Sequence, residues 1–479
     1  MSALRAELDV VSRASRAGDG ARCGVCTFMR VTTERRIFFL FAEGLSDPDV
    51  HTALAAAGGF CPRHARWMLH DLDGYRLADI YRGVLQARLE RILGHGAARV
   101  VARGACTLCE TEQWAQDHGL WAIARGRSGG DPAVPRSPDG LCRPHLVALL
   151  GRWPWPRAPE LRERLAMLLE DPGTLPDSRD GRARMLEPLL GVDLDARVRT
   201  SAPPDEASAP WGGGAWTIEG LTAELDARRC PVCSALDLVL DWFFRWRSSR
   251  LREGQEDVDF DALCEAHIWD VSAAPALLSR ALAVQVRAWR RYLAAIPTPE
   301  ELPSTRVERR VAAALRAWSA WTPNDERREW RRPSPAAFVV PALQPGRTLR
   351  GRREHARPRD ACVACRAMRD TRTTVLGLLS AALLTAASRE AYERSPGLCL
   401  RHLERAVEAW SPDAVAIATR VATGRVALLR WELAEAGRKS AWTARYEPAG
   451  LERSAWVRAL TTSVGSTILQ DRWLAPEPG

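Results

Sequence analysis

The sequence predicts an all-α chain of four repeated helical modules arranged as two halves. Three observations lead to this prediction. All twelve cysteines fall into four copies of one pattern, a C-x-x-C pair followed some thirty residues later by C-x-x-H. Apolar residues recur at three- and four-residue steps over long stretches, which is the period of an amphipathic helix. Runs that alternate apolar and polar residues, as strands do, are nearly absent.

The four copies place three cysteines and one histidine at matching positions. Between the second and third cysteine lie 34, 32, 30 and 33 residues. We therefore expect each copy to fold back on itself and to bring its four side chains to one point, as in a tetrahedral metal site. The sixteen candidate ligands, copy by copy, are Cys23, Cys26, Cys61 and His64; Cys106, Cys109, Cys142 and His145; Cys230, Cys233, Cys264 and His267; and Cys362, Cys365, Cys399 and His402.

Zinc suits mixed thiolate and imidazole ligation, and a site whose four positions are all filled by protein contributes to folding rather than to catalysis. The sequence therefore favours four structural zinc ions. The same residue types also hold iron-sulfur clusters, and four clusters in one chain would make an electron carrier, so this alternative stays open. Disulfide pairing is disfavoured, because the N-terminal segment has no apolar run typical of a secretory signal. We expect a cytoplasmic protein.

Each C-x-x-C pair precedes an aromatic-rich helical run, such as residues 37–41 and 238–246. The C-x-x-H element follows a glycine in three copies, at 59–64, 140–145 and 397–402, and opens another helix with Cys and His in its first turn. A helix N-terminus stabilises a thiolate. The pattern predicts helical hairpins, each pinned by a metal at one end.

A third helix is expected to complete each module. Apolar residues recur with helical spacing at 76–93, 276–296 and 414–436, and over a shorter stretch at 159–171. The longest apolar run, 375–387, is too short to span a bilayer and contains hydroxyl residues, so it is typical of a buried helix.

The spacing of the copies predicts two helical domains, 1–171 and 217–479. The segment 172–216 is rich in Pro, Gly, Ser and Asp and is expected to be a linker. A second irregular stretch at 297–359 lies between the third and fourth copies, where an insertion is expected.

Two parts of the chain resemble a family of bacterial helical domains of unknown function. They are the string GGFCPRHARWML with its upstream C-x-x-C, and a C-terminal closing segment with Gly450, Glu452, Ser454, Ala455, Trp456, Arg458 and Ala459, in which one residue is inserted before the tryptophan. The resemblance implies a bacterial origin and metal-bound helical modules. It implies no reaction.

The formal net charge is +9, and about +5 once twelve thiolates and four zinc ions are included. Such a weakly basic chain gives little support to nucleic-acid binding, although the arginine-rich string at 346–360 could contact phosphate. The sequence contains no phosphate-binding loop and no H-E-x-x-H. We therefore expect a non-catalytic scaffold that binds another protein.

Overall fold

The computed structural model describes residues 23–42, 47–71, 74–94, 106–125, 140–152, 158–170, 175–176, 178–191, 229–252, 263–271, 275–295, 362–444, 446–448 and 450–465. Within these ranges every regular element is a helix and no strand occurs, which confirms the all-α prediction. The helices of the first half are α2 (Gly24–Ala42), α3 (Pro48–Ala57), α4 (Pro62–Asp71), α5 (Gly74–Leu93), α6 (Thr107–Arg125), α7 (Arg143–Arg152), α8 (Ala158–Leu168) and α9 (Arg179–Leu190).

The second half contains α11 (Pro231–Arg252), α12 (Glu265–Asp270), α13 (Pro275–Ala295), α19 (Val363–Ala382), α20 (Ala386–Arg394), α21 (Leu400–Ala409), α22 (Pro412–Ser440) and α23 (Ala455–Val464). Two short 3-10 turns, Trp442–Ala444 and Leu451–Ser454, lie between α22 and α23. The four expected third helices correspond to α5, α8, α13 and α22. None of the described helices is long and apolar enough to cross a membrane.

The described residues form two compact units, and each unit draws on both halves of the chain. Unit 1 takes its residues from 1–28, 116–193 and 248–365, and unit 2 from 29–115, 194–247 and 366–479. Four of the five boundaries fall inside the helices that follow the C-x-x-C pairs, which are α2, α6, α11 and α19, and the fifth lies at 193/194.

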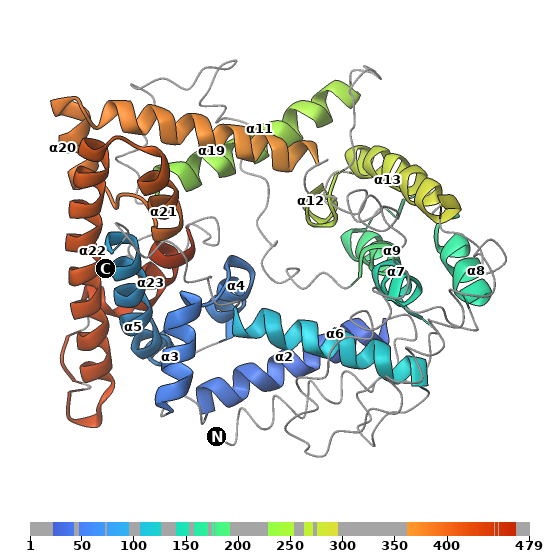
Figure 1. The fold of residues 1–479 in the computed structure, drawn as a ribbon, viewed down its shortest axis with the longest axis horizontal. Helices are drawn as coiled ribbons and strands as arrows, with labels where there is room; N and C mark the ends of the chain where they lie inside the picture. The colour runs from blue at the N-terminus through green and yellow to red at the C-terminus, as the bar shows by residue number, and fades with distance from the viewer. Residues whose placement is uncertain are drawn as a thin grey trace, which may run out of the picture. The chain divides into compact units, whose positions relative to one another are not determined.

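In unit 2, α5 packs against α22, α23 and α3 (Figure 1). The fully buried side chain of Tyr81 lies in the core between them. Arg88 of α5 is also buried and forms an ion pair with Glu404 of α21 at 3.0 Å. The same guanidinium donates to the hydroxyl of Ser463 in α23 at 3.0 Å. Since α5 belongs to the first half of the chain and α21 and α23 to the second, Arg88 ties the two halves together within this unit.

The closing segment joins α22 to α23 through buried charges. The Gly450 N–H and the Lys439 ammonium donate to one oxygen of Glu452, at 2.7 and 2.9 Å. These two contacts lower the pKa of the Glu452 carboxyl to about 2. Arg458 pairs with Glu432 of α22 at 2.6 Å, and the Glu432 side chain is buried. The motif residues Gly450, Glu452 and Arg458 therefore have a structural role, which is to dock α23.

In unit 1, α13 packs against α8, and α7 packs against α8 and α9. Arg290 of α13 donates to the carbonyl oxygen of Leu169, at the end of α8, at 2.8 Å. Arg143 of α7 stacks its guanidinium over the Trp289 ring, 3.8 Å from the ring centroid. Arginines therefore join elements of the two halves here as well.

The expected linker at 172–216 includes α9, whose Leu186, Leu189 and Leu190 are buried. The residues of that segment beyond 191, and the expected insertion at 297–359, lie outside the described residues.

Candidate metal centres

The sixteen candidate ligands converge in four groups of three cysteines and one histidine. The groups are site 1 (Cys23, Cys26, Cys142, His145), site 2 (Cys61, His64, Cys106, Cys109), site 3 (Cys230, Cys233, Cys399, His402) and site 4 (Cys264, His267, Cys362, Cys365). The prediction that each copy closes on itself is therefore wrong. Each C-x-x-C meets the C-x-x-H of the other copy in the same half of the chain.

Helix length explains this exchange. The helices that begin at the C-x-x-C pairs contain 19 to 22 residues and so extend about 28–33 Å. The chain reaches its own C-x-x-H only after that run. In the first copy the described part of the connection includes α3, which has 10 residues and is about 15 Å long, only about half the length of α2. The hairpin prediction assumed a return helix of matching length, and the described residues between each C-x-x-C helix and its own C-x-x-H contain none.

The exchange nests the sites within each half. Site 2 spans 61–109 and lies inside the 23–145 span of site 1; site 4 spans 264–365 and lies inside the 230–402 span of site 3. We call sites 1 and 3 the outer sites, and sites 2 and 4 the inner sites. Unit 1 holds one outer and one inner site, sites 1 and 4, and unit 2 holds the other two.

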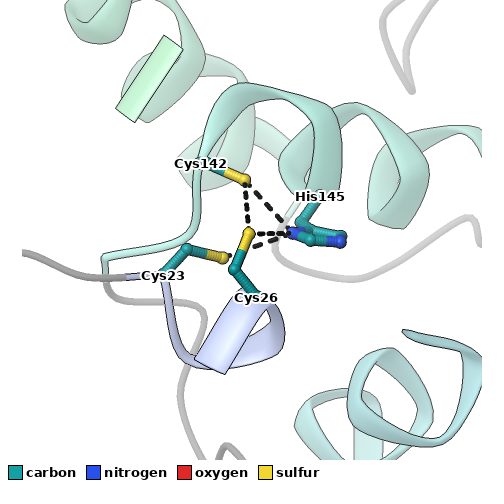
Figure 2. A group of neighbouring side chains, drawn as sticks. All are labelled: Cys23, Cys26, Cys142 and His145. Atoms are coloured by element: carbon teal, nitrogen blue, oxygen red, sulfur yellow. Dashed lines mark hydrogen bonds between the residues drawn. The ribbon is translucent and has the colours of Figure 1, made fainter. Parts of the chain in front are cut away.

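Every site joins the N-terminal ends of two helices. In site 1, Cys23 directly precedes α2 and Cys142 directly precedes α7, and the second ligand of each pair lies in the first helical turn (Figure 2). The carbonyl groups of both cysteines accept the first helical hydrogen bonds, from Thr27 at 3.0 Å and Leu146 at 2.9 Å. Two positive helix-dipole ends therefore point toward three thiols, which favours their thiolate forms.

The distances fit a single tetrahedral ion. Histidine Nδ1 lies 3.1–3.5 Å from the sulfurs of its site. One Sγ–Sγ pair in each site lies 3.6–3.9 Å apart, and all ligand atoms of a site lie within 4.8 Å of one another. Zinc bonds of about 2.3 Å to sulfur and 2.0–2.1 Å to nitrogen, at tetrahedral angles, require edges of about 3.8 and 3.6 Å. The side chains thus surround a space of the size that one ion fills.

The thiols of one site share protons through hydrogen bonds, which indicates that they need a nearby positive charge before all of them can ionise. Hydrogen bonds from Cys142 and Cys26 lower the pKa of the Cys23 thiol far below its usual range. Its contacts with Cys23 and Cys26, together with burial, raise the pKa of Cys142. The three thiols cannot all ionise so close together without a cation, and a bound divalent ion would supply that charge.

A glycine lies against two sulfurs in each outer site. A Cβ at Gly191, after α9, would lie 3.4 Å from Cys26 Sγ and 3.6 Å from Cys142 Sγ; at Gly465, after α23, it would lie 2.9 Å from Cys233 Sγ. Both glycines have positive φ, 85° and 103°. The last helix of each half therefore ends with backbone covering the outer site. The sequence analysis did not single out either glycine.

An acidic residue orients the histidine of site 2. While Nδ1 of His64 faces the sulfurs, its Nε2 lies 3.1 Å from Oε1 of Glu112, whose side chain is buried. Arg63 binds the other Glu112 oxygen. Such a carboxylate fixes the tautomer and the ring position of a metal-binding histidine. In site 4, the corresponding distance from His267 to Asp270 is 4.0 Å. The sequence analysis did not single out Glu112.

Comparison with family models, with curated proteins and with solved structures finds no match for this chain.

Proposed function

We propose that the four sites hold structural zinc ions and that the protein is a non-catalytic helical scaffold that binds another protein. One observation carries the first part: each site offers four protein ligands at tetrahedral spacing, which leaves no position for a substrate. Each ion would join two helix ends, and in both units the ions would hold together segments that are far apart in the sequence.

The geometry gives less support to the alternative, an electron carrier with four iron-sulfur clusters. In a cluster, the ligands bind different irons that are separated by bridging sulfides. Ligand atoms that all lie within 4.8 Å of one another leave space for one ion and not for a cluster. The ligand types alone suit both cofactors, so the spacing is the feature that favours zinc.

An exposed aromatic pair supports the binding role. Trp242 and Trp246 of α11 are 49% and 40% exposed, and their rings stack with centroids 5.7 Å apart. Large aromatic side chains are enriched at protein interfaces. The proposed partner is therefore another protein. We also propose that the chain is related to the bacterial helical domains that it resembles.

Metal analysis after purification without oxygen tests the proposal. We expect a colourless protein with about four zinc ions per chain. A brown protein with iron and acid-labile sulfide in stoichiometric amount, bleached by dithionite, would instead establish the electron carrier.

Paired cysteine variants test which ligands share an ion. Cys26 and Cys142 belong to one site, whereas Cys26 and Cys61 belong to two. Cys26→Ser with Cys142→Ser should therefore leave about three zinc ions, and Cys26→Ser with Cys61→Ser about two, because each damaged site loses its ion. If instead Cys26→Ser with Cys61→Ser kept more zinc than Cys26→Ser with Cys142→Ser, each copy would close on itself as first predicted.

A further inference from the structure

The outer and inner sites differ in how well their sulfurs are shielded. All four ligands of sites 1 and 3 are buried, with exposed fractions of 7% or less. In site 2, Cys61 and Cys109 are partly exposed, and in site 4 Cys365 is partly exposed. A metal-bound thiolate is displaced only if an incoming ligand can approach, so access to sulfur governs exchange.

The covering glycines strengthen this difference. Gly191 and Gly465 bring peptide backbone against the sulfurs of Cys26, Cys142, Cys233 and Cys399, which are four of the six cysteines in the outer sites. The backbone is fixed there by the end of α9 in one case and of α23 in the other, so opening an outer site requires the last helix of that half to move.

We propose that the two inner sites are exchangeable metal sites, which release zinc to an external thiol or chelator, while the two outer sites keep their ions. This inference rests on the proposed zinc content. The step is a ligand exchange without redox change. An incoming thiolate bonds to zinc as a partly exposed cysteine leaves, and the released cysteine thiolate takes up a proton.

The distribution of the sites allows each compact unit to release zinc without losing both of its ions. Each compact unit contains one outer and one inner site, so each unit can lose one ion while the other ion still joins its helix ends. The acceptor would be a small thiol or a thiol-bearing protein surface, because thiolate is the soft donor that competes for zinc bound by cysteine. The scaffold would then respond to the supply of zinc or thiol.

Zinc release from the folded, fully loaded protein tests the inference. Mixed with an excess of 4-(2-pyridylazo)resorcinol, the protein should give up about two of four ions in a fast phase and the other two only when denaturant is added. Brief treatment with iodoacetamide, followed by peptide mass spectrometry, should label Cys61, Cys109 and Cys365 first and the outer-site cysteines last.

A matched pair of variants assigns the phases. Cys109→Ser with Cys365→Ser should abolish the fast phase and leave two slow ions, whereas Cys233→Ser should leave the fast phase intact. If these variants do not fold, the labelling order of the wild-type protein decides. Four zinc ions released in one phase, or outer-site cysteines labelled first, would overturn the inference but not the zinc proposal. Absence of zinc from the purified protein would overturn the proposal itself.

Discussion

Replacing Gly465 with alanine should open site 3. The new Cβ would lie 2.9 Å from Cys233 Sγ and 3.7 Å from Cys399 Sγ, and the first distance is shorter than real carbon-sulfur contacts. Either the sulfur or the end of α23 must move by about half an ångström, more than the roughly 0.2 Å that zinc coordination tolerates. The backbone adds strain, because φ is 103° and ψ is 155°, a region nearly restricted to glycine.

The loss of stability expected for Gly465→Ala is the sum of the backbone strain and the overpacking. A non-glycine residue in that backbone region costs about 1–3 kcal/mol. Overpacking a well-filled site costs about 1–3 kcal/mol more. We therefore expect Gly465→Ala to destabilise unit 2 by about 2–6 kcal/mol and to reduce the zinc content from about four ions to about three.

Gly424→Ala is the matched control, since nothing but the neighbouring backbone of α22 itself lies within 4 Å of its Cβ position in the interior of that helix. It should raise stability by about 0.5–1 kcal/mol, because alanine is the better helix former. The effect of Gly191→Ala on stability should lie between those of Gly465→Ala and Gly424→Ala, since its Cβ would lie 3.4 Å from the Cys26 sulfur. Denaturant unfolding and zinc analysis measure both effects. Four zinc ions and an unchanged melt for Gly465→Ala would refute the reasoning.

Three further predictions concern buried charges. Arg88→Ala should cost about 3–5 kcal/mol by denaturant unfolding, because it removes the buried guanidinium that pairs with Glu404 and binds Ser463. Arg82→Ala on the exposed face of the same helix should change stability by less than about 0.5 kcal/mol. Equal effects would contradict the role of the ion pair. Glu112→Gln should weaken zinc at site 2 about ten- to a hundredfold in chelator competition, while Glu110→Gln, exposed on the same helix, should not; equal affinities would show that His64 needs no orienting group. Glu452 has a lowered pKa, so its stabilising effect is full above pH of about 4.5 and is lost as the pH falls toward 2. As the pH falls through that range, the difference in unfolding free energy between wild type and Glu452→Gln should become smaller. A difference that grows as the pH falls would show that the Glu452 pKa is not lowered in the folded protein.

The ligands could be predicted from the sequence, but their pairing could not. Cysteine and histidine spacing indicates which residues form the candidate metal sites, because a tetrahedral site needs three thiols and an imidazole to converge. The interval of 30–34 residues is nearly the same in all copies, so spacing does not separate pairing within a copy from exchange between copies.

One signal for the exchange was present in the third copy. Its C-x-x-C helix ends at Arg252, and Cys264 follows twelve positions later. To return along a helix of about 33 Å, those residues would need most of their extended reach of about 40 Å. The two covering glycines were harder to find, because their role arises from contacts with sulfurs many residues away in the sequence.

The nesting of sites implies an order of assembly as the chain leaves the ribosome. The ligands of site 2 lie 42–48 residues apart, so this site can close early, whereas site 1 must wait for His145, 122 residues after Cys23. In the second half, site 4 joins residues 95–101 apart, and site 3 joins residues up to 172 apart. Closing a longer loop costs more chain entropy and takes more time. Cys230 and Cys233 would stay without their partners through most of the synthesis of the second half, the period in which the growing chain is most exposed to mispairing and to capture by other metals.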